Sequence, residues 1–194
     1  MLGVLAMTAP ATDELDPSTL ARAVRGDRDA TRALVECYQG RVFALASRML
    51  AQRGRSTIED VAQETFLHAF RVLATFDPRG TAKLSTWLLT IAARRAIDEL
   101  RRQRPVLLVD EPDRAGPARA DEQAVRRELI AAIEAALREL SPELRAAFLL
   151  REYHDLEYAE IADALDIEIG TVKSRLARAR AALRERLEEV RDGK

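Results

Sequence analysis

The basic residues near the C-terminus are the clearest candidates for chemistry in this chain. Residues 170–187 contain Lys173 and five arginines against one acid, Glu185, which gives a net charge of +5. Arginine and lysine bind DNA phosphates and the acceptor atoms that bases present in the major groove. A helix that only faces water usually mixes charges of both signs. We therefore interpret the segment as a DNA-reading helix; the alternative is an exposed helix stabilised by ion pairs four residues apart.

The residues before this helix complete a helix-turn-helix pattern. Residues 158–165 predict a short amphipathic helix, 166–168 a tight turn and 170–183 a second helix. Asp166 occupies a turn position that often needs a left-handed backbone, which aspartate tolerates better than most residues. Thr171 and the glycine before it leave the amides of the second helix open to a phosphate. The inward-facing positions are Ile161, Ala162, Leu165, Ile167, Val172 and Leu176.

A second candidate site lies in the first half of the chain. Residues 76–87 mix glycine, hydroxyls and a cation between Phe76 and Trp87, and residues 89–104 that follow carry a net charge of +3. Aromatic rings and loop hydrogen bonds can hold a base that has left its stack. The alternative is a plain helix connection with Phe76 and Trp87 in the core.

Other kinds of chemistry find no support in the sequence. The one cysteine, Cys37, cannot form an internal disulfide, and His68 and His154 lie far apart, so we expect no metal site and a reduced, cytoplasmic setting. No nucleophile is paired with a base and no glycine-rich loop could hold phosphates, so we expect no catalytic residue, no cofactor and no enzymatic activity. No apolar run approaches the roughly 18 residues that span a bilayer, and the apolar N-terminus lacks a basic signal-peptide region.

The elements that would position these residues are helices throughout. Alanine, leucine, arginine and glutamate dominate and no window alternates as a strand does, which predicts an all-α fold. One helix is expected to end near Gly54, the next to begin with a capping box of Ser56 and Glu59, and a third to run over residues 85–102. Ser141, followed by proline and glutamate, predicts another helix start.

Composition divides the chain into two small helical domains. Residues 105–117 hold three of the seven prolines, so we expect a flexible acidic linker. The predicted boundaries are a tail at 1–17, a first domain at 18–103, the linker at 104–124 and a second domain at 125–190. The overall charge of −1 argues against nucleic acid only at first sight, because residues 138–168 alone carry −6.

Four motifs in register resemble a known family. They are residues 60–66 (DVAQETF), 85–92 (STWLLTIA, followed by the arginine pair at 101 and 102), 140–143 (LSPE) and 170–180 (GTVKSRLARAR). Their order and spacing, over about residues 20–188, are similar to those of bacterial sigma-70-type factors of the extracytoplasmic-function (ECF) group. The resemblance implies sigma region 2 in the first domain and sigma region 4 in the second, without region 1.1 or region 3. It also implies a function: binding core RNA polymerase, directing initiation at minus-35 and minus-ten elements, and assisting promoter melting.

The resemblance also assigns three sets of site residues. Those facing the clamp helices of the polymerase β′ subunit are Asp60, Gln63, Glu64 and Phe66. Those for minus-ten DNA are Phe76, Asp77, Arg79, Lys83, Trp87, Arg94, Arg95 and Arg101. Those for minus-35 DNA are Thr171, Lys173, Ser174, Arg175 and Arg178, with Thr171 and Arg175 expected on phosphates. The implied partners are core polymerase (β′ clamp helices and β flap), promoter DNA and an anti-sigma factor, with no small-molecule substrate and no membrane insertion.

The chain departs from the family pattern at two places, and two other functions compete with the one that the resemblance implies. Ala93 and Arg94 stand where the family commonly has Arg-Asn, and Glu157 replaces the usual Ser or Thr cap of the first helix-turn-helix helix, which predicts a weaker cap. One competitor is a conventional helix-turn-helix regulator that binds duplex DNA as a dimer, which would leave residues 60–66 unexplained. The other is an interaction protein without DNA binding, against which the +5 helix argues.

Overall fold

The computed structural model describes residues 14–80, 82–102 and 120–191, and every regular element in these ranges is a helix. The all-α prediction is therefore confirmed for this part of the chain, whereas most of the expected tail and linker lies outside it. In chain order the elements are α1 (Pro17–Val24), α2 (Arg28–Met49), α3 (Arg55–Val72), the 3-10 turn η1 (Leu73–Thr75), α4 (Leu84–Arg101), α5 (Ala120–Glu139), α6 (Pro142–Glu152), α7 (Tyr158–Leu165) and α8 (Ile169–Arg191).

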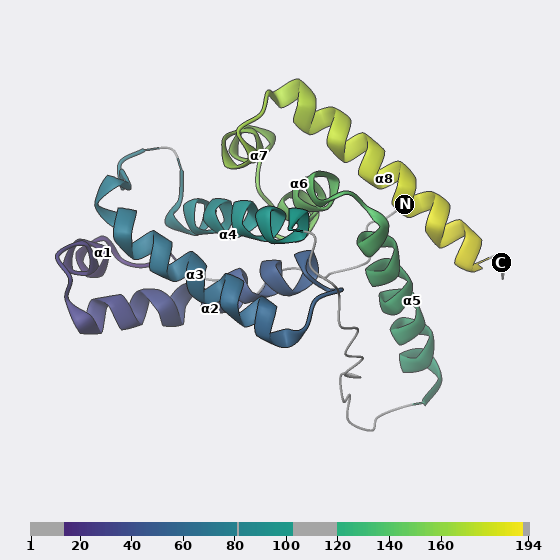
Figure 1. Cartoon of the computed structure of the whole chain (residues 1–194), viewed down its shortest axis with the longest axis horizontal. Helices are drawn as coiled ribbons and strands as arrows, with labels where there is room; N and C mark the ends of the chain where they lie inside the picture. Colours follow the sequence, from purple (N-terminus) through teal and green to yellow (C-terminus); the bar gives the residue numbers. More distant parts are fainter. Residues whose placement is uncertain (1–13, 81, 103–119, 192–194) are drawn as a thin grey trace.

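The first half of the molecule, α1 to α4, is a small bundle. Helices α2, α3 and α4 all pack against one another, and α1 covers the start of α2 (Figure 1). Apolar residues three and four positions apart form the buried face of α3, as its periodicity predicts. They are Val61, Phe66 and Ala69, and the polar Thr65 is buried beside them with its hydroxyl donating to the Val61 carbonyl at 2.7 Å.

The start of α3 differs from the sequence prediction. Gly54, in an extended conformation, is the N-cap, so the helix begins at Arg55 and the predicted capping box of Ser56 and Glu59 is wrong. Ser56 already lies inside the first turn, and Glu59 instead forms an ion pair with Arg55 at 2.8 Å, one helical turn away. Glycine serves as an N-cap because its backbone reaches the extended conformation freely, even though it has no side chain to accept a hydrogen bond.

In the second half, α6 and α7 begin where the sequence predicts, whereas α5 already begins at Ala120, inside the expected linker, and α8 extends to Arg191. Ser141 caps α6 by accepting a hydrogen bond from the Leu144 amide at 3.4 Å, with proline at the first helical position. Helix α7 has the predicted bounds, and Asp166 after it has the expected left-handed backbone, with φ of 53°. The Glu157 amide donates to the Glu160 carboxylate at 2.8 Å, which is one half of a capping box and supports the start of α7.

The two halves are packed directly against each other. Helix α4 contacts α6 and α7, and α2 contacts α6, so α4 lies between the first bundle and the helix-turn-helix (Figure 1). Buried residues of both halves form one continuous hydrophobic cluster. The sequence predicted two domains joined by a flexible linker and gave no indication that they contact each other.

Candidate nucleic-acid interface

The outer face of α8 presents the residues predicted to bind minus-35 DNA. Val172, Leu176 and the alanine at 179 are buried and fix the rotation of the helix. Lys173 and Arg178 consequently point into solvent. Of the other three predicted residues, Ser174 is exposed and Thr171 and Arg175 are half-buried. The structure therefore brings all five onto one accessible stretch of the helix-turn-helix.

Two further arginines of α8 have partners inside the protein. Arg180 is bound to Glu152 of α6 at 2.5 Å, and this hydrogen bond raises the pKa of its guanidinium. Arg186 is bound to Glu139 of α5 at 3.1 Å. Part of the +5 charge of the segment thus holds α8 on its supporting helices, and the part facing solvent is concentrated on the first turns of the helix.

The two predicted aromatic residues, Phe76 at the end of η1 and Trp87 in the first turn of α4, lie against each other. The ring centroids of Phe76 and Trp87 lie 5.5 Å apart at 50°, and both rings are half-buried on the core. The Asp77 carboxylate accepts the Arg79 amide at 2.9 Å and closes a tight turn. Asp77, Arg79 and Lys83 are exposed. Both alternatives for these rings therefore hold in part: the rings pack on the core, as in a plain helix connection, and they remain partly accessible, as a base-binding site requires.

A cavity of about 220 Å³ lies between α3 and α4 beside the loop that joins η1 to α4. Sequence reasoning named Trp87, Arg94 and Arg95 among its lining and missed the polar groups His68, Thr90 and Asp98. The spacing of the polar residues on α4 could have identified this lining, because Thr90, Arg94 and Asp98 follow one another at four-residue steps and therefore share one face of the helix.

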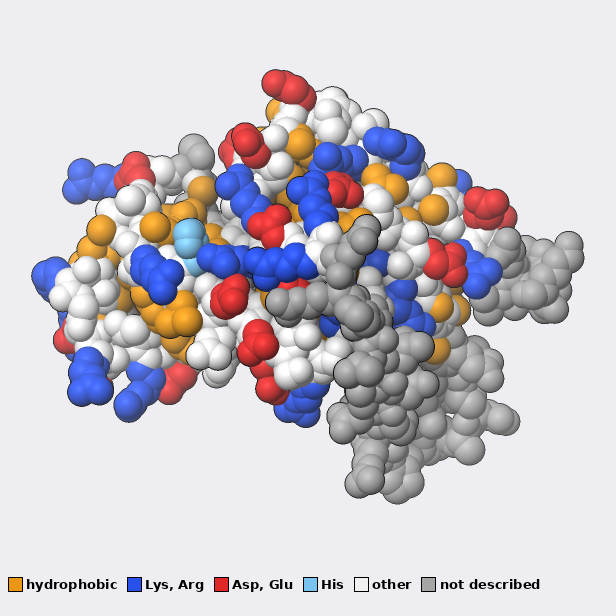
Figure 2. Space-filling model, viewed as in Figure 1, with side chains coloured by type: hydrophobic (Ala, Val, Ile, Leu, Met, Phe, Trp, Pro, Cys, Tyr) orange, Lys and Arg blue, Asp and Glu red, His pale blue; other side chains and the backbone are white. Residues whose placement is uncertain are grey.

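Of the four arginines predicted for minus-ten DNA, the three on α4 are engaged within the chain. Arg95 is paired with Glu64 of α3 at 2.9 Å. Arg94 donates to backbone carbonyls at the end of α7, and Arg101 is paired with Glu143 of α6 at 2.8 Å. Figure 2 shows basic side chains crossing the middle of this face, with acidic side chains above and below them.

The predicted polymerase-binding residues occupy the outer side of α3, with one correction. Asp60, Gln63 and Glu64 are exposed, as expected. Phe66 is only 8% exposed and packs in the core beside Phe70, so it does not stand on the exposed face. It instead forms part of a shallow groove of about 550 Å³ between α2 and α3.

This groove adds one apolar residue that sequence reasoning missed. Phe43 of α2 is 40% exposed and lines the groove together with Gln63 and Phe66. An exposed aromatic ring beside paired acids is typical of a protein contact. The helical periodicity of α2 did not indicate that Phe43 is exposed, because Phe43 lies next to the buried Val42 at the edge of the apolar face.

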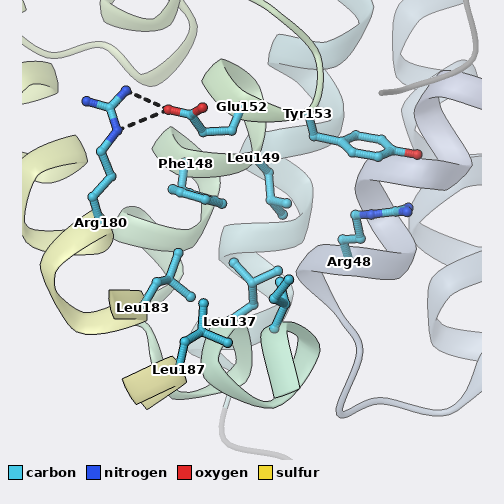
Figure 3. A pocket seen from close by; sticks show the side chains of 10 residues that line it. Arg48, Leu137, Phe148, Leu149, Glu152, Tyr153, Arg180, Leu183 and Leu187 are labelled. Carbon is cyan, nitrogen blue, oxygen red and sulfur yellow. Dashed lines mark hydrogen bonds and ion pairs between the residues drawn. The ribbon is translucent and has the colours of Figure 1, made fainter. Parts of the chain in front are cut away.

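A second groove, of about 140 Å³, opens between α5, α6 and α8 (Figure 3). Its walls are apolar: Ile133, Leu137, Phe148, Leu149, Leu183 and Leu187. The Glu152–Arg180 pair closes one side, and Arg48 of α2 lies 3.9 Å from the centre of the Tyr153 ring on another. The shape and lining suit an apolar helical segment of a partner.

The described ranges contain no group of three or more His, Cys, Asp or Glu side chains placed to share a metal ion. None of the helices in these ranges is long and apolar enough to cross a membrane.

Comparison with protein families gives two matches along the chain. Residues 34–106 match the model for Sigma-70 region 2, and residues 130–183 match the model for Sigma-70, region 4. The first match covers α3, the loop and α4, and the second covers the helix-turn-helix.

Full-length relatives extend the similarity over nearly the whole chain. The RNA polymerase sigma-H factor of Pseudomonas aeruginosa is 35% identical, over 92% of this chain and 97% of that protein. The ECF RNA polymerase sigma factor SigW of Bacillus subtilis is 31% identical, over 86% and 93%. The ECF RNA polymerase sigma-E factor of Escherichia coli is 34% identical, over 87% and 92%.

Solved structures agree with these relatives. CnrH, in complex with the cytosolic domain of CnrY, superposes with a TM-score of 0.63 at 27% identity, over 88% of this chain and 96% of that one. The sigma factor RpoE of Bartonella quintana, in complex with the anti-sigma factor NepR, shares the fold with a TM-score of 0.61 at 24% identity, over 81% and 96%. The sequence and fold together place the chain in the ECF group of the sigma-70 family of RNA polymerase sigma factors.

Proposed function

We propose that this chain binds core RNA polymerase and directs it to promoters that carry minus-35 and minus-ten elements. The observation that supports this most directly is the exposed basic start of α8 on a complete helix-turn-helix, in a chain whose other half carries a separate acidic protein-binding face. A simple regulator needs only the first of these. We assign residues 18–103 to region 2 and residues 125–190 to region 4.

The minus-35 element is read by the outer face of α8. Lys173, Ser174 and Arg178 are placed to contact base edges, because they project from the exposed side of the first turns. Thr171 and Arg175 lie lower on the sides of the helix, where phosphates run along the groove, and they fix its register.

The minus-ten element is held by α4 and the loop before it. Phe76 and Trp87 offer aromatic surface to an unstacked base, and the cavity between α3 and α4 offers room beside them. Arg94, Arg95 and Arg101 supply positive charge for the backbone of the opened strand. Melting is driven by the free energy of capturing bases, so the protein needs no catalytic group and acts as a binding subunit, not as an enzyme.

Two surfaces are assigned to protein partners in the cytoplasm. The outer side of α3, with Asp60, Gln63 and Glu64 beside the Phe43 groove, contacts the β′ clamp helices. The apolar groove between α5, α6 and α8 receives a helix of the β flap (Figure 3). An anti-sigma factor would regulate the chain by covering these faces, in keeping with the solved complexes of CnrH with CnrY and of RpoE with NepR.

Run-off transcription tests this function. Purified chain is added to core polymerase with a library of genomic promoter fragments, and we expect a discrete set of transcripts that core polymerase alone does not produce. A chain that neither binds core polymerase nor yields such transcripts would overturn the proposal. Dimeric binding to duplex DNA in the absence of polymerase would instead support the conventional regulator.

A further inference from the structure

The Glu14 carboxylate connects two helices of the first half at the end of the bundle where α4 begins. The Tyr38 hydroxyl of α2 donates to Glu14 Oε2 at 2.8 Å, and the Ser85 hydroxyl, in the first turn of α4, donates to Glu14 Oε1. Glu14 belongs to the segment that leads into α1, which lies at this end of the bundle (Figure 1). Glu14 therefore joins α2 to α4, although 71 residues separate it from Ser85.

The residues that follow Glu14 hold its backbone in place. The Leu15 amide donates to the Tyr38 hydroxyl oxygen at 2.8 Å, and the Leu15 side chain packs against the core. Asp16 is the N-cap of α1 and accepts from the Ser18 amide at 3.0 Å. The Glu14 side chain consequently extends from a fixed point, so that its carboxylate can hold the groups that bind it.

The two hydroxyls need an acceptor that takes both of their protons. Tyr38 is 1% exposed and Ser85 is 3% exposed, so a hydroxyl that loses its partner here is left unsatisfied. The Tyr38 oxygen already accepts the Leu15 amide, and burial, together with Glu14, raises the pKa of its hydroxyl above the usual 10, so Tyr38 keeps a proton to donate. An ionised carboxylate accepts at both oxygens, whereas a glutamine amide has one acceptor and one donor group. The site therefore favours glutamate over glutamine of the same size.

The first turn of α4 depends on this contact from outside the helix. Its N-cap residue, Lys83, makes no side-chain hydrogen bond to the turn. The Glu14 carboxylate, bound through Ser85, places a negative charge beside the turn, where the helix dipole favours it. Trp87 lies two residues after Ser85, and its ring centroid is 5.5 Å from that of Phe76. A shift of the first turn would therefore displace the aromatic pair that is proposed to receive an unstacked base.

We infer that Glu14 is a positioning residue for promoter melting: by accepting from Tyr38 and Ser85 together, it fixes the first turn of α4 in the arrangement that captures a base. The inference rests on the proposed function of Phe76 and Trp87 at the minus-ten element. In this role Glu14 does not touch DNA and acts through Ser85. Its loss lowers the fraction of chains whose aromatic pair is ready for a base, and base capture weakens by that fraction.

Three variants separate the link to α4 from the rest of the contact. Glu14→Ala removes both bonds, Ser85→Ala removes only the bond to α4, and Glu14→Gln retains one acceptor for the two hydroxyls. Glu14 is itself exposed, so its replacement leaves no cavity in the core. The matched control is Glu36→Ala, which removes an exposed glutamate from α2. Thermal unfolding followed by circular dichroism establishes that each variant is folded.

The fluorescence of Trp87 measures the positioning directly, because the chain contains a single tryptophan. We expect Glu14→Ala and Ser85→Ala each to raise the acrylamide quenching constant about twofold, since a looser first turn exposes the half-buried ring. Glu14→Gln should fall between these variants and the parent chain. The Glu14→Ala/Ser85→Ala chain should be quenched no more than Glu14→Ala, because both substitutions break the same bond. Unchanged quenching in Glu14→Ala, or additive changes in the double variant, would overturn the inference.

Permanganate footprinting measures the consequence for melting. It detects unpaired thymines, here in holoenzyme on a promoter recovered by run-off transcription. We expect strand opening at the minus-ten element to slow about tenfold in Glu14→Ala and Ser85→Ala. Binding to core polymerase and to the closed duplex should match the parent chain and Glu36→Ala.

Two outcomes of footprinting would overturn the inference. Equal losses in core binding, closed-duplex binding and opening would show that Glu14 only supports the fold. Unchanged opening in a variant with altered quenching would show that the position of Trp87 does not limit melting. A parent chain that directs no initiation would instead overturn the proposed function, whereas the quenching comparison would still decide whether Glu14 positions Trp87.

Discussion

Arginine occurs in this protein in three environments that a charge count treats alike. Arg145 is buried among carbonyl groups, Arg94 is bound to the end of a helix, and Arg178 faces solvent. Burial lowers the pKa of Arg145 to about 10, with the nearby Arg138 adding to the effect, so the side chain is still charged near neutral pH. Only the environment tells which arginine holds the fold together and which is available to DNA.

The exposed arginines and lysine of α8 carry the first prediction. Replacing Lys173 or Arg178 by alanine should lower minus-35-dependent initiation about tenfold, since one good contact to a base edge contributes roughly 1–3 kcal/mol. Binding to core polymerase should stay unchanged in a gel-shift titration. Arg184→Ala is the control, because it removes an exposed charge farther along the same helix. Loss of core binding in either variant would mean that the roles are misplaced.

His154 provides a prediction on pH. It is 4% exposed, and neither ring nitrogen has a hydrogen-bond partner among the described residues. Burial, together with Arg41 and Arg48, lowers the pKa of His154 to about 3 from its usual 6.5. The unfolded chain therefore takes up a proton between these values that the folded chain does not, and acidification destabilises the fold.

Urea unfolding at a series of pH values measures this effect. The free energy of unfolding should fall by at most about 1.4 kcal/mol per pH unit below pH 6.5 through this one group. His154→Leu should flatten the dependence between pH 6.5 and 5, above the range in which most carboxylates titrate. An unchanged slope in that variant would assign the pH dependence to other groups.

At the scale of the elements, local sequence determines most of what is observed. The bounds of α7, the cap at Ser141 and the left-handed Asp166 were predictable because each depends on residues within one or two turns. The start of α3 was not, because Gly54 and Ser56 both suit an N-cap and the choice depends on how the preceding turn leaves α2. Phe66 illustrates the same limit, since its periodicity indicated the core while the family motif indicated a partner.

The turn of the helix-turn-helix can be tested through Asp166. Its φ of 53° costs a residue with a β-carbon about 1–2 kcal/mol, a cost that glycine avoids. Asp166→Gly should therefore keep or raise the thermal midpoint, whereas Asp166→Val should lower it. The exposed Asp163→Ala, inside α7, should change stability by less than about 0.5 kcal/mol. Equal midpoints for the glycine and valine variants would contradict the argument.

The outer face of α3 carries the next prediction. Asp60→Lys should weaken association with core polymerase about tenfold, because it reverses an exposed charge in the proposed contact without breaking an internal pair. Glu64→Lys should act in the same direction but also lose the Arg95 pair, so Asp60 gives the clearer result. Glu36→Lys, exposed on α2, is the control. Fluorescence titration against core polymerase measures all three, and unchanged affinity for Asp60→Lys would remove this face from the proposed interface.

At the scale of the whole molecule, the net charge of −1 is a sum of unlike surfaces. One acid of the second half, Glu143, pairs with an arginine of the first, Arg101, so part of the charge cancellation is a contact between the halves. This could not be read from the sequence: 96 residues separate Arg145 from the Met49 carbonyl that it binds. The motifs predict two DNA-binding surfaces, but only the packing shows that Arg94 and Arg101 of one of them also contact the second half.

We expect the buried Arg145 to couple the unfolding of the two halves, because its guanidinium binds carbonyl groups of both. Both halves share one hydrophobic cluster, so the parent chain should unfold in one calorimetric transition. Arg145→Met removes the guanidinium and leaves the Met49 and Arg138 carbonyls without their donor, at a cost of about 3 kcal/mol. We expect the midpoint to fall by roughly 6 to 12 °C and the transition to split in two, as each half unfolds by itself.

Arg151→Met separates this coupling from simple destabilisation. Arg151 lies on the same helix, but its hydrogen bonds to the Leu156 carbonyl and to Glu157 stay within the second half. Its loss should lower the midpoint while leaving one transition, because the contact between the halves is intact. If Arg145→Met also unfolds in one transition, with equal calorimetric and van't Hoff enthalpies, the halves are coupled through the apolar cluster and not through this arginine.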